Sequence, residues 1–229
     1  MAELEKKFFG NLKGSLGDVV FRNRNEKNYV AHKPKSYNAP STAEFKERTG
    51  KFKLAVKLAS AIYSFYPLKK IWAGAVASGK SAFPHIVQVN YPFVEESNIT
   101  NMVAMAPRSS FGVNLQNLNI DNTSLTIELA PIAEASNVDT SVEKQIQILA
   151  VVFLQQPVQA GLPDYDFLKI TSAKMNIDAV NPIVFNMPLF TADSGIAGNY
   201  TNKKIMFTAI TYDETDSVVQ FSSTVNYSA

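Results

Sequence analysis

The chain contains no cysteine among its 229 residues, which excludes a disulfide framework and thiolate chemistry. Histidine is almost as scarce, because His32 and His85 are the only two and lie far apart in the sequence. A histidine-based metal site or a serine–histidine relay would have to use one of them. We expect both to be packing or surface residues, and the sequence predicts no metal site and no cofactor.

The sequence also lacks the pattern of an export signal or a membrane span. Its first residues include acids where a signal peptide carries basic residues, and no long apolar run follows them. The longest apolar stretch, from Ile148 to Leu154, has the length of a strand. We therefore expect synthesis in the cytoplasm and no membrane partner.

Acidic residues are scarce at the start of the chain. Residues 1–90 hold 6 of the 20 Asp and Glu but 16 of the 22 Lys and Arg, and residues 91–229 hold the other 14 acidic and 6 basic residues. The formal net charge of +2 therefore combines +10 on the first part with −8 on the second. Opposite charges on separate parts of a chain favour head-to-tail contact between copies, or docking of one part on a polyanion.

Residues 1–40 are expected to form an extended arm that carries a β-hairpin. Strand-like runs at 19–22 and 29–32 flank a polar turn, and glycines at positions 10, 14 and 17 mark further turns. A single hairpin is marginally stable in water. It must therefore pack on the rest of the chain or on a neighbouring molecule.

Basic side chains are interleaved with aromatic ones along this hairpin. The candidate subunit interface consists of Phe21, Arg22, Arg24, Tyr29, Lys33 and Lys35. Nucleic-acid-binding surfaces show the same pattern, but so does a positive face that meets the acidic part of another copy. We favour contact with a second copy of the chain, or with other structural proteins, over nucleic acid.

Residues 41–90 are predicted to be helical. Ser41 and Glu44 have the spacing of a capping box, and the helix that follows should reach about Phe65. A weaker second helix is predicted over 68–82. The apolar stripe of the first helix is expected at Phe45, Phe52, Val56, Ala59 and Tyr63, widened by Leu54, Leu58 and Ile62.

Residues 91–229 change to short apolar or alternating runs separated by Asn, Asp, Gly and Pro. The run at 145–155 is apolar on both faces, so it is expected to be a central strand. The predicted fold class is α+β: an N-terminal arm with a hairpin and a helical segment, followed by an antiparallel immunoglobulin-like β-sandwich over 91–229. Strands are predicted at 110–115, 124–129, 145–155, 167–175, 203–212 and 217–227, with a seventh at 102–106 or 183–189.

The segment from Gly74 to Ser81 matches the phosphate-binding loop pattern, in which Lys80 would reach the outer phosphate oxygens. The expected surroundings are wrong, because the preceding stretch is short and charged and Pro84 follows too closely for a helix. We interpret the segment as small residues that pack closely on a neighbour. Five acids at 164, 166, 213, 214 and 216 could serve acid–base chemistry or calcium, but exposed turns between strands are normally acidic.

A series of motifs in the first ninety residues resembles a known family. The series is the glycine-rich run from Gly10 to Phe21, then Tyr29-Val30 with Lys33-Pro34, then Pro40-Ser41-Thr42 leading to Arg48 and Phe52. It is similar to a family of Bacteroidota and phage-associated proteins that have a glycine-rich N-terminal hairpin, a "PST…R-x-x-F" helix and a C-terminal β domain. The family pattern has an arginine near the position of Lys33-Pro34. The resemblance implies a non-enzymatic, assembly-related protein and transfers no catalytic residue.

We expect a structural, self-assembling protein rather than an enzyme, with its N-terminal arm placed on a neighbouring copy to form a ring or filament. A virion component, such as a tail, neck or capsid-associated protein, is the first choice, and an extracellular or cell-surface filament subunit is the second. The final location would then be a virion or an extracellular assembly. Two alternatives are a nucleotide hydrolase acting through Lys80, and a carbohydrate- or receptor-binding module with exposed aromatics such as Tyr165, Phe167, Tyr200 or Tyr212.

Overall fold

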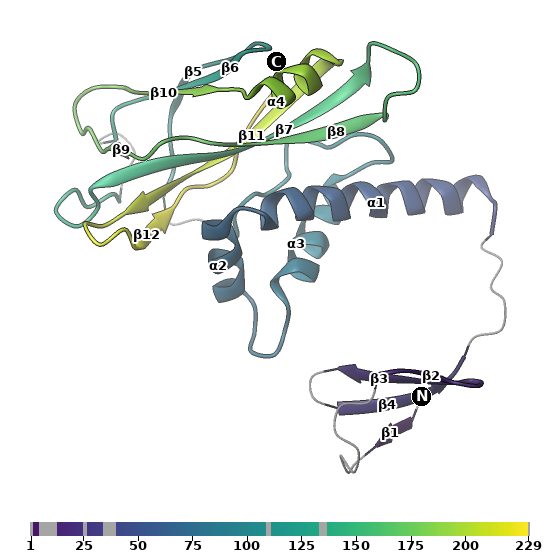
Figure 1. Ribbon diagram of the computed structural model, residues 1–229. Coiled ribbons are helices and arrows are strands. Elements are labelled where there is room, and N and C mark those ends of the chain that lie inside the picture. Colours follow the sequence, from purple (N-terminus) through teal and green to yellow (C-terminus); the bar gives the residue numbers. More distant parts are fainter. Residues whose placement is uncertain are drawn as a thin grey trace. The chain divides into compact units, whose positions relative to one another are not determined.

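The computed structural model describes residues 2–4, 13–24, 27–33, 40–108, 111–132 and 137–228. The chain divides into two compact units, Met1–Phe45 and Lys46–Ala229, and each is described by itself (Figure 1). Helices and antiparallel sheets are both present. The predicted α+β class is therefore confirmed.

The smaller unit contains a four-stranded antiparallel sheet, which we call the N-terminal sheet, in the order β1-β4-β3-β2. The predicted hairpin forms its centre, but the two strands continue further into the predicted turn until Arg24 pairs with Lys27. The side chains of Asn23 and Asn28 are joined across the strands by a 2.8 Å hydrogen bond, so these polar residues belong to the ladder. The strands are β1 (Ala2–Leu4), β2 (Gly14–Leu16), β3 (Val19–Arg24) and β4 (Lys27–His32).

The larger unit contains most of α1 (Ala43–Tyr63), followed by α2 (Tyr66–Ala75), α3 (Ala82–Asn90), the short 3-10 helix η1 (Tyr91–Phe93) and α4 (Thr191–Gly198). None of the helices in the described segments has the length and apolar character needed to cross a bilayer. The sequence pattern did not predict α4.

The start and the buried face of α1 differ from the prediction. Thr42, rather than Ser41, caps the helix, because its Oγ1 accepts the backbone N–H of Phe45 at 3.3 Å. Phe52, placed on the predicted stripe, is 55% exposed. The predicted stripe combined aromatic and aliphatic residues. In the structure the aliphatic residues face inward, whereas the aromatic residues Phe52 and Tyr63 lie at the edge of the buried face. The buried residues are Leu54, Ala55, Leu58, Ala59, Ala61 and Ile62.

The second predicted helix is two helices. The chain leaves α2 at Val76, whose backbone is extended, and Gly79 has a φ of +78°, which glycine adopts without strain. The helix α3 then begins at Ala82. The prediction of one continuous helix over 68–82 was wrong. The small residues at 73–79 are compatible with both a helix and a turn, so the sequence pattern did not show the break.

The β region of the larger unit contains two antiparallel sheets. The six-stranded central sheet has the order β12-β11-β7-β8, with β13 also on β11 and β9 also on β7. The three-stranded outer sheet has the order β10-β6-β5. The strands are β5 (Leu115–Ile120), β6 (Ser124–Leu129), β7 (Gln145–Pro157), β8 (Tyr165–Thr171), β9 (Met175–Asn176), β10 (Ile183–Pro188), β11 (Tyr200–Tyr212), β12 (Val218–Phe221) and β13 (Val225–Ser228).

Several predicted strands move or divide in the structure. The strand predicted at 110–115 is wrong, because the first strand of this region is β5 at Leu115–Ile120, an Asn-rich segment that reads as a turn. The strand predicted at 217–227 divides into β12 and β13, because Ser222 interrupts the pairing and its Oγ accepts the N–H of Ala209 at 2.8 Å. The seventh strand is β10, whereas 102–106 forms no strand.

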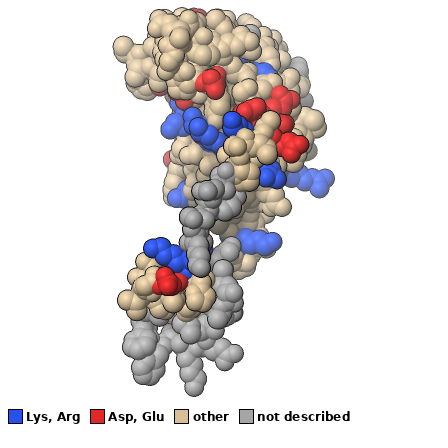
Figure 2. Space-filling view, turned by 90° about the vertical axis from the view of Figure 1, so that its right-hand side faces the viewer, with Lys and Arg blue, Asp and Glu red and all other residues tan. Residues whose placement is uncertain are grey.

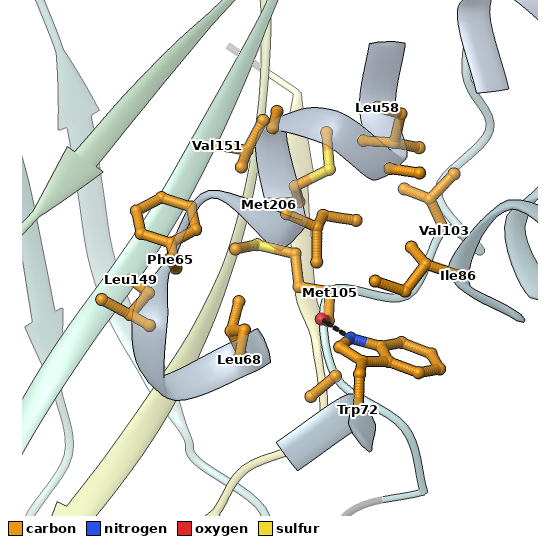
Figure 3. Close-up of a cluster of buried hydrophobic side chains, with 14 of the residues drawn as sticks. Leu58, Phe65, Leu68, Trp72, Ile86, Val103, Met105, Leu149, Val151 and Met206 are labelled. Atoms are coloured by element: carbon orange, nitrogen blue, oxygen red, sulfur yellow. Dashed lines mark hydrogen bonds between the residues drawn. The ribbon is translucent and has the colours of Figure 1, made fainter. Parts of the chain in front are cut away.

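The central strand was predicted correctly. The strands β7 and β11 pair along their whole lengths, and both of their faces are buried. On one face Ile148, Ala150 and Phe207 pack against the outer sheet. On the other face Leu149, Val151 and Met206 pack against the helices α1–α3 (Figure 3). The larger unit therefore has three layers: helices, central sheet and outer sheet (Figure 1).

Buried polar contacts join the helical layer to the loop that follows it, and besides Trp72 the buried Asn90 of α3 exchanges two hydrogen bonds with the backbone of Ala104. The indole N–H of Trp72 donates a 2.8 Å hydrogen bond to the carbonyl oxygen of Met105 (Figure 3). Both residues are almost completely buried within the apolar cluster between helices and sheet. This bond satisfies the only polar atom of a large buried side chain.

Replacing Phe153 by alanine should lower the free energy of unfolding by about 3–5 kcal/mol, because its ring is buried on the helix-facing side of β7. The control is the same change at the half-exposed Phe52, for which we expect a loss of about 0.5 kcal/mol or less. Urea denaturation followed by circular dichroism measures both. Equal losses in the two variants would contradict the three-layer arrangement.

Candidate interaction surfaces

The register of the N-terminal sheet places its side chains on two different faces. Residues directly opposite one another share a face, so Leu16 lies with Val19, and Phe21 lies with Val30. Val19 and Phe21 are two positions apart on β3 and share the same side. This side carries Leu16, Val19, Phe21 and Val30, for which we call it the apolar face, and the same register places His32 and the hydrogen-bonded pair Asn23–Asn28 at its two ends.

Arg22 and Tyr29 are paired on the opposite side, together with Ser15, Val20 and Ala31. The six candidate interface residues therefore do not share one surface, because the side chains of a strand alternate with a period of two. Lys33 is exposed just after β4, where its backbone N–H donates to the carbonyl of Asp18 at 2.6 Å. The side chain of Arg24 and the whole of Lys35 lie outside the described residues.

The N-terminal sheet has no hydrophobic core within its described residues. Leu16 is 75% exposed, and Val19, Phe21 and Val30 are only partly buried. Asn28 is the single fully buried residue among those described in this unit, whereas both apolar clusters of the chain begin at Leu54 or later. The apolar face therefore leaves hydrophobic surface without full cover.

The excess of positive charge lies more on the helices than on the N-terminal segment. Residues 1–40 hold eight basic and four acidic residues, whereas 41–90 hold eight basic and two acidic ones. The helical residue Lys53 lines one cleft with Glu96 and Asp164 from the β region. Figure 2 shows basic and acidic residues side by side on one face of the larger unit. Part of the charge separation read from the sequence is thus compensated within one molecule.

An apolar groove of about 510 Å³ lies between α1 and α3, and we call it the α1–α3 groove. Gln88 is the only residue with a polar side chain other than Tyr91 among those that line it. The ammonium group of Lys51 lies 4.9 Å from the centre of the Tyr91 ring, which places a positive charge beside the groove. The lining residues are Phe52, Val56, Phe83, Pro84, Val87, Gln88, Tyr91 and Pro92.

A second cleft, of about 620 Å³, lies between α2 and the β11–β12 turn. The hydroxyl of Tyr212 donates a 2.8 Å hydrogen bond to Oε1 of Gln147, and the ammonium of Lys174 lies 3.6 Å from the centre of the Tyr212 ring. Lys174 is also paired with Asp216. Burial, with a further contribution from the charge of Asp216, raises the pKa of Tyr212 to about 12. The phenol therefore keeps its proton to a higher pH than an exposed tyrosine and remains a hydrogen-bond donor to Gln147.

The segment that matches the phosphate-binding loop connects two helices. Contrary to the prediction, a helix does follow it, since Pro84 is tolerated in the first turn of α3, where its missing N–H would have no helical partner. The preceding element is α2 rather than a buried strand. Lys80 is exposed between the two helices. The loop therefore does not have the strand–loop–helix context that cradles a phosphate.

The acidic residues considered for chemistry occupy two separate places. Tyr165 pairs with Gln155 at one end of β7, next to Asp164, whereas Tyr212 pairs with Gln145 at the other end, next to Asp213. Hydrogen bonds from the Ser217 backbone and the Thr215 hydroxyl lower the pKa of Asp213, which organises its own turn. Among the described residues, no three His, Cys, Asp or Glu side chains gather as metal ligands would.

The four aromatics considered for carbohydrate binding do not form an exposed platform. Tyr165, Tyr200 and Tyr212 are buried and Phe167 is partly buried. Phe153, Tyr165 and Phe167 contact one another under α1, with ring centres 5.0–6.2 Å apart. Tyr165, Phe167 and Tyr212 pack in the cluster between the helices and the central sheet, whereas Tyr200 packs in the cluster between the central and outer sheets.

No family model matches the chain, and the search of curated proteins finds no match. Solved structures with weak likeness include the β-glucosidase from Kluyveromyces marxianus, at 8% identity and a TM-score of 0.22 over 52% of this chain and 15% of that enzyme. Another is β-glucosidase 3B from Thermotoga neapolitana in complex with glucose, at 8% identity and a TM-score of 0.19 over 53% of this chain and 17% of that enzyme. The chain thus spans less than a fifth of these enzymes, and a likeness of this size carries no argument about activity.

The raised pKa of Tyr212 predicts a pH dependence of stability. The phenol ionises near pH 10 in the unfolded chain and near 12 in the folded one, so its contribution is present below about pH 10 and is lost as the pH rises towards 12. In the Tyr212→Phe variant, the free energy of unfolding should fall less steeply between about pH 9 and pH 11 than in the wild type. Urea titrations at several pH values measure this slope.

The control for this experiment is Tyr66→Phe, because Tyr66 is 67% exposed and lies in the same cleft. This variant should keep the wild-type slope. An identical slope in wild type and Tyr212→Phe would show that the Tyr212 phenol is not held in its neutral form by the fold.

Proposed function

We propose that the chain is a non-enzymatic structural protein that assembles with copies of itself through its N-terminal sheet. The observation that carries this proposal is the apolar face, which holds Leu16, Val19, Phe21 and Val30 without full burial of any of them. A sheet is stable when its apolar face is covered by another layer. Few strands with one uncovered face are marginal in water, so this sheet gains most from a partner.

A second copy of the same sheet is the simplest cover. Two identical apolar faces packed against each other form a two-layer β structure across a two-fold axis, in which each residue meets its counterpart or that residue's partner. The outer sides of this pair would carry Arg22 and Tyr29, which remain in water. This arrangement assigns Phe21 to the contact and removes Arg22 and Tyr29 from its centre.

The setting that we propose for this assembly is a virion, as a tail, neck or capsid-associated component. The support is the resemblance of the first ninety residues to the phage-associated family, whose N-terminal hairpin corresponds to β3 and β4. An extracellular or cell-surface filament is the second proposed setting. We also interpret the outer and central sheets as an immunoglobulin-like sandwich, to which α1–α3 add a third layer on the far side of the central sheet.

The alternatives from other classes are less well supported. A carbohydrate- or receptor-binding surface built on Tyr165, Tyr200 and Tyr212 would need these side chains exposed, and they are buried. A nucleotide hydrolase would need a strand before the loop that carries Lys80, and a helix stands there. Both observations favour a structural role over binding or catalysis at those residues.

The change Leu16→Asp should disrupt self-assembly while leaving the larger unit folded. Leu16 is 75% exposed, so the change removes no buried core contact, but it places a charge at the apolar face. The matched control is Ser15→Asp, which adds the same charge at the neighbouring exposed position on the opposite face. Light scattering coupled to size-exclusion chromatography measures the mass of each variant.

We expect wild type and Ser15→Asp to share one oligomeric mass, and Leu16→Asp to be smaller. Circular dichroism should show the same thermal transition of the larger unit in all three proteins. Wild-type protein that remains monomeric at high concentration would refute assembly. A Leu16→Asp variant with the mass of the wild type would refute the role of the apolar face.

A further inference from the structure

Phe190 is the most exposed of the large hydrophobic residues in the described part of the chain, at 80%. Its backbone is nevertheless fixed on both sides. The N–H of Leu189 donates to the carbonyl of Thr123 at 2.7 Å, and the N–H of Ser194 donates to the carbonyl of Phe190 at 2.8 Å in the first turn of α4. The exposed ring, which we call the Phe190 knob, therefore projects from a backbone that hydrogen bonds hold in place. This order lowers the entropic cost of burying the ring in a contact.

Acidic side chains lie next to this knob. Asp193 stands in the first turn of α4, three positions after Phe190. Asp121 lies in the β5–β6 turn, where its Oδ1 accepts the N–H of Thr123 at 2.6 Å. The carbonyl of the same Thr123 accepts the N–H of Leu189, so this turn lies next to Phe190. Hydrogen bonds from Thr123 and Ser124 lower the pKa of Asp121, and Lys203 adds a smaller charge effect. Asp121 and Asp193 thus lie on the elements that hold Phe190, with Lys203 beside Asp121, within a β region of net charge −8 over residues 91–229.

The α1–α3 groove has the complementary properties. It is an apolar hollow of about 510 Å³, with Lys51 beside Tyr91 at its margin. The segment 46–90, which forms the helices around it, holds eight basic residues and a single acidic one. An apolar knob with acidic neighbours therefore matches this groove in both polarity and charge.

The knob and the groove cannot meet within one molecule. The helix α4 contributes Ala197 to the cluster between the central and outer sheets, whereas α1 and α3 pack on the other face of the central sheet. Figure 1 shows α4 and α1 on opposite sides of that sheet. A contact between them must therefore join two copies, and because the two surfaces differ, it repeats head to tail.

We propose that Phe190 of one copy inserts into the α1–α3 groove of the next copy, and that the acidic residues around it face the basic helices. This inference rests on the proposed self-assembly and adds to it a second, heterologous contact. The N-terminal sheet pairs copies two by two, and the knob-and-groove contact extends the pairs into a ring or filament. The wild-type particle should then exceed a dimer and should shorten as salt screens the charges.

The absence of cysteine from the natural chain allows a direct test of this contact by disulfide trapping. Thr191→Cys places a thiol next to the knob, and Gln88→Cys places one at the groove, while Phe190 and the apolar groove residues are retained. The two single variants are mixed at low salt with a mild oxidant. We expect a covalent heterodimer of the two variants on a non-reducing gel.

Two controls separate this contact from random collision. Glu214→Cys replaces Thr191→Cys in a parallel mixture, because Glu214 is exposed in the β11–β12 turn at the far end of β11 from α4. Adding Phe190→Ser to the Thr191→Cys variant should lower the yield of heterodimer at least about tenfold, since losing a buried aromatic contact of about 1.4 kcal/mol or more changes affinity by that factor. A yield that is equal in either control overturns the proposal.

The same mixture is repeated with Leu16→Asp in both partners, so that the N-terminal sheet no longer joins copies. A heterodimer that persists and still depends on Phe190 supports the knob-and-groove contact even if the N-terminal sheet proves to play no part. If Leu16→Asp reduces the wild-type assembly but no Phe190-dependent heterodimer forms in either background, this inference is wrong and the proposed function stands.

Discussion

The pairing of β7 with β11 is the constraint on which the larger unit depends. The two strands pair antiparallel over their full lengths, and both faces are buried over residues 148–154 of β7 and 205–212 of β11. A sheet with two apolar faces needs a layer on each, because every exposed apolar residue would cost the free energy of its transfer from water. The outer sheet covers one face, and the helices α1–α3 cover the other. The Trp72–Met105 hydrogen bond joins α2 to the loop that follows the helices.

This arrangement moves the surfaces available for recognition away from the central sheet. Tyr165, Tyr200 and Tyr212 sit on strands of that sheet and are used for packing, so they are lost to ligands. Apolar surface that stays accessible in the described residues includes one face of the N-terminal sheet, the α1–α3 groove and Phe190. Apolar surfaces of this kind mark sites of contact with other molecules more often than sites of chemistry.

The charge pattern has a different meaning in three dimensions than along the chain. The sequence suggests a basic arm and an acidic domain, but the helices hold more of the excess positive charge than the N-terminal segment does. Because those helices pack on the β region, Lys53 already lies near Glu96 and Asp164 of the same molecule. Among the helical lysines, Lys51 lies beside the α1–α3 groove, whereas Lys53 and Lys70 line other clefts.

The sequence by itself determined the α+β class, the helix beginning near residue 42, the hairpin of β3 and β4, and β7 as a central strand, because apolar periodicity and caps are local signals. It left β5 and α4 unrecognised, since Asn-rich strands and short helices lack such signals. Only the tertiary structure decided which stripe of α1 is buried, that Phe21 shares a face with Val30, and that Phe52 and Phe190 stay exposed. Those outcomes depend on strand register and on which layers meet, and both are set by contacts between residues far apart in the chain.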